Sequence, residues 1–580
     1  MKRSIFPMFL CTALIMLSSS AATARTLFDY NTMMNGPYNA TVNLSAYTPD
    51  GGATAATHTF QGTLSFNGTP STTLVTRNSA YVTTSQWNTA QSLPSDFNFR
   101  FVQSGDTIIP ELRGARASTH SWWEFVLEPG RVWNESTDNG YSRAAIPFAL
   151  TQRNSNCTHN GVLMFLFKND GSTSRIAFQI ASETCRYLKF DMWGLFSTRT
   201  YTPGTVPGAS ALIAAYNTEL ANRLPVFPIT QLVADYNRAD GSEVVPGNFA
   251  IGGATHRSVY GFVIDGRNYR SDCITRNGNY PYCDVMVLPS YSTAKSIVGA
   301  LGLMRLEKLY PGARNGLLRA YVAQCQNAQW STETMEHALD MTTGNYISAG
   351  YMTDEGGTTQ TNFFVGTTHS SRITTACTGY ANKILPGNTW VYHSSDTYVL
   401  GTAMNAFLRS QPGHSTDDFY THLIVPDVWN GLHLSGTINS TRRSYDSTAQ
   451  PFTAYGLFYH HDDIARIARF MDEQNGQIGG SQLLNPAMLD AALQRSPGDP
   501  GKTLPSPYTY LRYNNGFWAS NLGTAIGCST ARYVPFMSGF GGISVLLLPN
   551  DTVYYTFMDD GTTDWTTAAV EADRIRDYCN

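Results

Sequence analysis

The stretch from residue 291 to residue 312, YSTAKSIVGALGLMRLEKLYPG, contains the most informative pattern in the chain. Beyond Lys295 it is apolar on nearly every side of a helix, and charged side chains return only with Arg305, Glu307 and Lys308. A helix that is apolar all round is buried in a folded protein. Because Pro311-Gly312 ends the pattern, we predict a buried helix from Ser292 to Tyr310.

Ser292 and Lys295 open this helix, and their spacing places both side chains on one face. The hydroxyl would lie in the positive field of unpaired backbone N–H groups, and a lysine kept neutral by burial can take its proton. A Ser-x-x-Lys pair also arises by chance, but a lysine is rarely buried without a role. The sequence therefore predicts Ser292 as a nucleophile with Lys295 as its partner.

A second polar segment lies about a hundred residues further on, where Tyr392 precedes a polar turn and an expected helix. Its phenol could face the serine, and beside an ammonium group the pKa of a tyrosine falls, so that it can act as a base. His393 and His337 lie at no recognisable spacing from a nucleophile and are interpreted as surface or structural histidines.

The rest of the chain divides into a strand-rich first part and a mixed second part. Residues 25–202 consist of short alternating runs between Gly, Asn, Asp and Ser clusters, which predicts a β-rich domain, most simply a sandwich. Residues 203–245 form a Pro-rich linker with one helix over 211–224, and residues 246–580 form a second domain. In this second domain we expect strands over 258–264, 541–548 and 553–558 and a last helix from Asp564 to Cys579.

The first residues predict export. Lys2 and Arg3 precede an apolar run from Ile5 to Leu17 and a cleavage site at Ala22-Thr23-Ala24, as in a signal peptide over residues 1–24. The run is too short for a permanent membrane anchor, and no later stretch is long enough to span a bilayer. We therefore expect a periplasmic or secreted protein.

The composition excludes several classes of partner. Charged residues make up only 14% of the 580 residues, with 39 Lys and Arg against 43 Asp and Glu. Nucleic-acid binding needs clustered basic residues, so we expect no nucleic-acid partner. The substrate is expected to be a small or peptide-like molecule, and the sequence does not indicate an oligomeric state.

Eight of the nine cysteines follow the predicted signal peptide, and an even number suits an oxidising compartment. Pairing between nearest neighbours is the simplest expectation, although eight cysteines allow 105 connectivities. No C-x-x-C pair and no Cys/His spacing typical of zinc occurs, so no metal site is predicted.

Five segments, taken in order, resemble the serine β-lactamase and penicillin-binding-protein superfamily. Within it the chain is most similar to the class C-like serine hydrolases, which include esterases and 6-aminohexanoate-oligomer hydrolases. The segments are Ser292-x-x-Lys295, residues 330–344, Tyr392-x-Ser394, residues 454–493 and residues 535–549. The resemblance covers residues 246–580 and implies an α/β domain with an antiparallel sheet flanked by helices, in which the first and last strands are shared.

The resemblance also implies an activity, the cleavage of an amide or ester through an acyl-enzyme on Ser292. Lys295 and Tyr392 would share the proton transfers, and which of them is the acylation base stays open. The backbone N–H groups of Ser292 and Phe540 would form the oxyanion hole. Substrate contacts would come from Ser394, Ser538 and Gly539, with no cofactor.

The third motif departs from the pattern of that superfamily. β-Lactamases and DD-peptidases have Lys-Thr-Gly or His-x-Gly where this chain has Met537-Ser538-Gly539. The cation that helps bind a substrate carboxylate is therefore missing, which favours an esterase or amidase. The alternatives are a β-lactamase or D-amino-acid-specific peptidase and, in another class, a weakly active binder or sensor.

Overall fold

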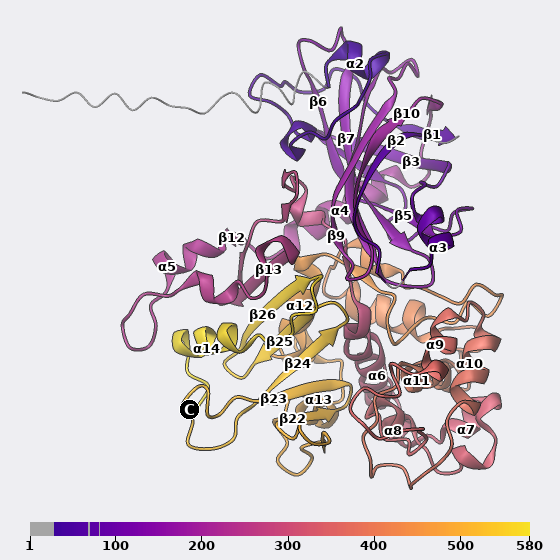
Figure 1. The fold of residues 1–580 in the computed structure, drawn as a ribbon, viewed down its shortest axis with the longest axis vertical. Helices are drawn as coiled ribbons and strands as arrows, with labels where there is room; N and C mark the ends of the chain where they lie inside the picture. Colours follow the sequence, from indigo (N-terminus) through magenta and orange to yellow (C-terminus); the bar gives the residue numbers. More distant parts are fainter. Residues whose placement is uncertain (1–27, 68–69, 81, 580) are drawn as a thin grey trace, which may run out of the picture.

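The computed structural model describes residues 28–67, 70–80 and 82–579. The predicted signal peptide, residues 1–24, lies outside the described residues. Figure 1 shows a strand-rich N-terminal part above a C-terminal part in which a sheet lies beside a group of helices.

The N-terminal part is built on one antiparallel sheet of eleven strands, in the order β11-β1-β3-β4-β6-β7-β8-β9-β10-β2, with β5 paired to β7. The sheet curls around its own aromatic core, which includes Phe60, Phe66 and Phe101. The expected two-sheet sandwich is therefore wrong, because one continuous sheet buries its inner face by curling. Trp123 is fully buried in this core, and Trp122 packs beside it. The strands are β1 Gly62–Asn67, β2 Ser71–Asn78, β3 Asp96–Ser104, β4 Thr107–Pro110, β5 Trp123–Leu127, β6 Gly130–Asn134, β7 Ser142–Gln152, β8 Thr158–Phe167, β9 Ile176–Thr184, β10 Lys189–Phe196 and β11 Arg199–Pro203.

The connecting segment contains more structure than one helix. Helix α4 (Ala209–Asn222) lies close to the predicted range, and α5 (Leu232–Asp235) follows it. Between them, β12 (Val226–Pro228) pairs in parallel with β14 (Arg267–Arg270) and so joins the edge of the C-terminal sheet.

The C-terminal sheet has nine strands in the order β12-β14-β13-β26-β25-β24-β23-β22-β21. Apart from the β12–β14 pair, its neighbours are antiparallel, and β13 pairs with β26. The first and last strands thus share the sheet, which confirms the expected arrangement. The strands not yet defined are β13 Arg257–Ile264, β21 Lys502–Thr503, β22 Leu511–Asn514, β23 Phe517–Asn521, β24 Tyr533–Gly539, β25 Ile543–Leu548 and β26 Thr552–Met558.

Helices cover both faces of this sheet. On one face Met537, Val545 and Leu547 pack with α12 (His461–Met471) and the helix after Ser292. On the other face Phe536 and Leu546 pack with α14 (Thr566–Ile575), drawn at the left of the sheet in Figure 1. The predicted antiparallel sheet flanked by helices is therefore confirmed.

The helix predicted from Ser292 is present but not uniform. A short 3₁₀ turn over Tyr291–Thr293 leads into a π-helical turn over Lys295–Ala300, and regular α-helix begins with α6 (Leu301–Leu309). π-Helical turns are frequent at functional sites. The remaining helices of this part include α7 Leu318–Tyr321, α8 Met335–Leu339, α9 Thr358–Val365, α10 His369–Thr378, α11 Ser394–Arg409 and α13 Pro486–Ala492.

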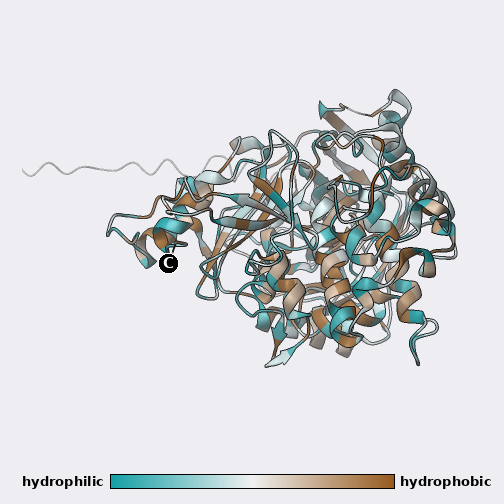
Figure 2. Ribbon diagram, turned by 90° about the horizontal axis from the view of Figure 1, so that it is seen from below, coloured by the Kyte–Doolittle hydropathy of each residue, from teal (hydrophilic) through white to brown (hydrophobic). Residues whose placement is uncertain are grey.

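The N-terminal and C-terminal parts share one hydrophobic core. Val162 and Met164, on the outer face of the curled sheet, belong to the same apolar cluster as Leu288 and Met304. Figure 2 shows apolar and polar residues interleaved along the helices, as expected when each helix buries one face. The two parts therefore stabilise each other.

Four disulfides pair the eight cysteines of the described residues, each with its neighbour in sequence: Cys157–Cys185, Cys273–Cys283, Cys325–Cys377 and Cys528–Cys579. The nearest-neighbour prediction is confirmed. Among the helices in the described part of the chain, none combines the length and the apolar character needed to cross a membrane.

Candidate active site

The backbone before Ser292 is strained and tightly packed. Tyr291 has a φ of +41°, a conformation that side chains other than glycine rarely adopt, and such strain is concentrated at functional sites. Strand β24 lies directly against this segment, because a Cβ atom on Gly539 would come within 2.8 Å of the Ser290 carbonyl oxygen. Gly539 thus permits the close approach of the third motif to the predicted nucleophile.

Lys295 is buried and bonded to the predicted nucleophile. Its Nζ lies 2.9 Å from Ser292 Oγ, 2.9 Å from Ser394 Oγ and 3.1 Å from the Ala454 carbonyl oxygen. Burial lowers the pKa of Lys295 to about 8, against a smaller opposing effect of the Glu355 carboxylate. An appreciable fraction of the amine is therefore neutral near neutral pH, as a base must be.

Tyr392 lies beside the same pair. The Lys295 ammonium is 4.9 Å from the centre of its ring, and its phenol is buried near the Ser292 hydroxyl, which lowers the pKa of the phenol by a small amount. Burial raises the pKa of Tyr392 far above its ordinary value, and the nearby Glu355 carboxylate raises it further. The expectation that the ammonium lowers this pKa is wrong, because burial outweighs it.

Glu355 is a residue that sequence reasoning missed. Its carboxylate accepts hydrogen bonds from the Ser394 backbone N–H at 2.8 Å and from Ser394 Oγ at 2.5 Å, at the start of α11. A chain of contacts therefore runs from Ser292 through Lys295 and Ser394 to Glu355. No local pattern marks Glu355, which lies in a loop before α9.

Of the two interpretations given for His393 and His337, surface or structural, the contacts of both side chains within the fold favour the structural one. His393 is fully buried, with Nε2 3.0 Å from Asp354 and Nδ1 3.5 Å from Asp396. Although burial lowers the pKa of an imidazole, these carboxylates raise the pKa of His393 to about 9. His337 caps the first turn of α8 with its own ring.

The third-motif residues lie together at the end of β24. Ser538 lines a cavity of about 560 Å³, and Phe540 is 47% exposed. The ring of Phe540 lies 5.7 Å from that of Tyr291, which precedes the nucleophile. Ser292, Lys295, Tyr392 and Ser394 are thus in direct contact, with β24 alongside. The oxyanion hole at Phe540 and the substrate contacts of Ser394, Ser538 and Gly539 stay predictions.

The N-terminal sheet reaches the rim of this site. Its loop after β9 brings Tyr187 to 6.3 Å from the ring of Phe540 and Arg186 to 5.9 Å. The Tyr187 hydroxyl donates to Gln152 Oε1 at 2.5 Å and lies 3.1 Å from Ser155 Oγ. The Cys157–Cys185 disulfide joins the two loops that carry these residues.

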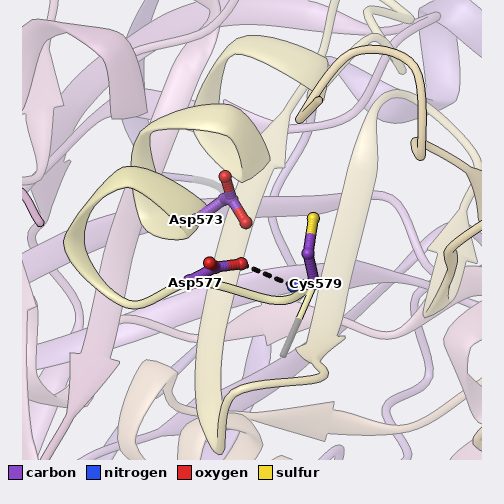
Figure 3. Close-up of side chains that lie close together, drawn as sticks. All are labelled: Asp573, Asp577 and Cys579. Carbon is purple, nitrogen blue, oxygen red and sulfur yellow. Dashed lines mark hydrogen bonds between the residues drawn. The ribbon is translucent and has the colours of Figure 1, made fainter. Parts of the chain in front are cut away.

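One group of side chains among the described residues has the spacing of a metal site. Asp573, Asp577 and Cys579 lie close together near the C-terminus (Figure 3). The sulfur of Cys579 is bonded to Cys528, so it is not a thiolate ligand, and the Asp577 carboxylate accepts the Cys579 backbone N–H. These residues fit a structural chain end better than a metal centre.

No family model and no curated protein sequence matches the chain. Among solved structures, a candidate 6-aminohexanoate-dimer hydrolase from Bacillus anthracis is similar at 15% identity and a TM-score of 0.42, over 61% of this chain and 86% of the other. A penicillin-binding-protein homologue from Caulobacter crescentus is similar at 14% identity and a TM-score of 0.39, over 57% of this chain and 98% of the other. EstCE1, a hydrolase with promiscuous acyltransferase activity, is similar at 12% identity and a TM-score of 0.43, over 63% of this chain and 100% of the other.

Proposed function

We propose that this protein is an exported serine hydrolase that cleaves an ester or amide through an acyl-enzyme on Ser292. The observation that carries the proposal is the buried Lys295 amine, 2.9 Å from Ser292 Oγ. A hydroxyl is a weak nucleophile until a neighbouring base removes its proton, and this amine is placed to do so. Four disulfides suit an oxidising compartment and support export.

In the acylation step, neutral Lys295 takes the proton of Ser292 as Oγ attacks the substrate carbonyl carbon. The backbone N–H groups of Ser292 and Phe540 hold the negative charge that develops on the carbonyl oxygen. Because its pKa is raised, Tyr392 keeps its proton and can deliver it to the leaving group while it receives another from Lys295. The C–O or C–N bond then breaks, and the acyl group stays on Ser292.

In the deacylation step, water attacks the acyl carbon and the order of proton transfers is reversed. Tyr392 gives its proton to the Lys295 amine as it takes one from water, so the two groups act as one relay. The bond between the acyl carbon and Ser292 Oγ then breaks, the carboxylic acid leaves, and Lys295 returns its proton to Oγ. The Ser394 hydroxyl and the Glu355 carboxylate hold Lys295 in place, which makes Glu355 a positioning residue.

The missing cation of the third motif favours substrates without a carboxylate at that position. Met537 and Ser538 stand where a basic side chain is expected, and a charge-assisted contact to a carboxylate contributes about 1.5–3 kcal/mol. We therefore expect simple short-chain esters to be hydrolysed with a kcat/KM about ten- to over a hundredfold above that for penicillin-type β-lactams.

A panel of esters, amides and nitrocefin, with wild-type protein and Ser292→Ala, tests the proposal. Ester or amide turnover that disappears in Ser292→Ala supports it. Nitrocefin turnover above ester turnover would favour the β-lactamase alternative, and a penicillin adduct that never hydrolyses would favour the binder or sensor. Near wild-type hydrolysis by purified Ser292→Ala would contradict the proposal.

A further inference from the structure

A short two-stranded ribbon leads into the predicted nucleophile. It consists of β17 (Leu288–Pro289) and β18 (Phe458–Tyr459), which pair in antiparallel fashion. Beyond the ribbon, the Ser290 backbone N–H donates to the Leu457 carbonyl oxygen at 3.0 Å, and the Leu457 N–H donates to Ser290 Oγ at 3.1 Å. The segment before β18 therefore fixes the backbone that precedes Ser292.

The same segment also contacts the proposed base. The Ala454 carbonyl oxygen, three residues before Leu457, lies 3.1 Å from Lys295 Nζ. Residues 454–458 are all buried, so this carbonyl is held by packing and by its neighbours in the chain. A displacement of residues 454–457 would therefore move a contact of the base and a contact of the nucleophile segment together.

Asn156, in the loop between β7 and β8 of the N-terminal sheet, binds this segment with both ends of its side-chain amide. Its Oδ1 accepts the Gly456 backbone N–H at 2.5 Å, and its Nδ2 donates to the Leu457 carbonyl oxygen at 3.2 Å. The side chain is fully buried, where an amide that loses its partners is costly. The two bonds therefore fix the position of residues 456 and 457.

A second asparagine makes the same kind of contact to the other strand of the ribbon. Asn160, on β8, accepts the Val287 backbone N–H with its Oδ1 at 3.0 Å and donates its Nδ2 to the Val287 carbonyl oxygen at 2.9 Å. Val287 immediately precedes β17, and Asn160 is buried. The N-terminal sheet thus holds both strands of the ribbon through buried amides, which is more specific than general packing between two parts of a chain.

We propose that Asn156 is a positioning residue of the acyl-serine chemistry, supplied by the N-terminal part, and that it keeps Lys295 and Ser292 aligned through residues 454–457. The inference rests on the proposed function and gives the N-terminal sheet a part in it. Asn156 acts through the backbone of Gly456 and Leu457. A misplacement of about 1 Å in a catalytic group can cost about a hundredfold in rate, so contacts of this kind affect turnover.

Asn156→Ala in the full chain tests this role, with Ser258→Ala as the matched control. Ser258 is a buried residue of β13 whose Oγ lies 2.7 Å from Thr184 Oγ1, at another contact between the two parts of the molecule. Both variants remove buried hydrogen bonds between these parts, but the control does so away from residues 454–457. We expect Asn156→Ala to lower kcat about tenfold with little change in KM, and Ser258→Ala to keep the wild-type kcat.

The pH profile gives a readout that a loss of stability alone would not change. A carbonyl that accepts a hydrogen bond from an ammonium group favours the charged form. When the Ala454 carbonyl is no longer held against Lys295, the midpoint of the kcat–pH profile should therefore move to lower pH. Asn156→Asp keeps the acceptor for Gly456 and loses the donor to Leu457, so it should lower kcat about threefold and provides a second variant if Asn156→Ala does not fold.

A wild-type kcat or an unchanged midpoint in the Asn156 variants, or a loss of kcat of the same size in Ser258→Ala, would overturn the positioning role while the hydrolase proposal stands. If the wild-type protein hydrolyses no ester or amide and a fluorophosphonate probe does not label Ser292, the proposed function itself fails. The two failures are therefore distinguishable.

Discussion

Two buried basic side chains adjoin Ser394, and their surroundings move their pKa values in opposite directions: Lys295 donates a hydrogen bond to Ser394 Oγ, and His393 precedes Ser394 in the chain. Burial lowers the pKa of Lys295 to about 8, since hydroxyl and carbonyl groups surround it and Glu355 opposes the shift only weakly. Burial acts on His393 as well, but Asp354 and Asp396 raise its pKa to about 9. The comparison teaches that carboxylates in contact decide whether a buried base serves chemistry or structure.

The largest expected effect comes from removal of the chemical base. Lys295→Ala should lower kcat by about 10²–10⁴-fold with little change in KM, because the amine acts in proton transfer. Tyr392→Phe should lower kcat by a factor in the same range. The double variant should have a kcat little below that of the worse single variant, since the two residues act as one unit. Steady-state kinetics on the best ester measures this.

Lys383→Ala, at an exposed lysine, is the matched control and should keep wild-type kinetics. A Lys295→Ala variant with more than a tenth of wild-type kcat would show that Lys295 is not the base.

The next effect concerns stability at His393. Its pKa is raised from about 6.5 in the unfolded chain to about 9 in the folded protein, so the ion pairs contribute about 3 kcal/mol below pH 6.5. This contribution falls as pH rises from 6.5 through 9. His393→Gln should remove it, and urea unfolding at pH 6 and pH 9.5 measures the change.

Lys295 should show the opposite sign in the same experiment. Its pKa is lowered to about 8 in the folded protein, so burial of the charged form costs free energy at low pH, and stability rises as pH goes from 8 toward 10.5.

Wild-type and His393→Gln proteins whose free energies of unfolding differ by the same amount at every pH between 6 and 9.5 would contradict the assignment of His393 as a structural cation.

The smallest effect tests the positioning residue. Glu355→Gln removes the carboxylate that raises the pKa of Lys295, so the midpoint of the activity–pH profile should move to lower pH. We expect kcat to fall about tenfold, because the Gln amide oxygen can still accept the Ser394 hydroxyl. Glu243→Gln, at an exposed carboxylate, is the control, and an unchanged midpoint in Glu355→Gln would show that Glu355 does not act on Lys295.

The sequence predicted the parts of the site that depend on local spacing. Ser292 and Lys295 are three residues apart on one helix, and Tyr392 and Ser394 lie just before and at the start of α11, so short motifs were enough to find them. Glu355 was missed because its role depends on a loop that meets α11 only in the folded chain.

The sequence predicted the direction of the Tyr392 pKa shift wrongly for a related reason. The neighbouring ammonium could be inferred from the motif, whereas complete burial and the Glu355 carboxylate come from tertiary packing. Likewise the π-helical turn at Lys295–Ala300 has no signature in the apolar pattern, which fits a regular helix equally well.

For the fold, strand patterns predicted the shared C-terminal sheet but not the form of the N-terminal one. The runs that form β13, β25 and β26 stand out by their apolar character, and the sheet pairs them as expected. In the N-terminal part, alternation marks an inner and an outer face, but it does not distinguish two packed sheets from one sheet that curls.

The most direct test of the account is the pH dependence of Ser292 labelling by a fluorophosphonate probe, located by mass spectrometry of the digested protein. Because neutral Lys295 must take the serine proton, the labelling rate should rise with pH and level off with a midpoint near 8. In Lys295→Ala the labelling rate of Ser292 should be much lower and should no longer show the midpoint near pH 8. A probe adduct on a residue other than Ser292, or a Ser292 labelling rate without a midpoint between pH 7 and pH 9, would contradict the account.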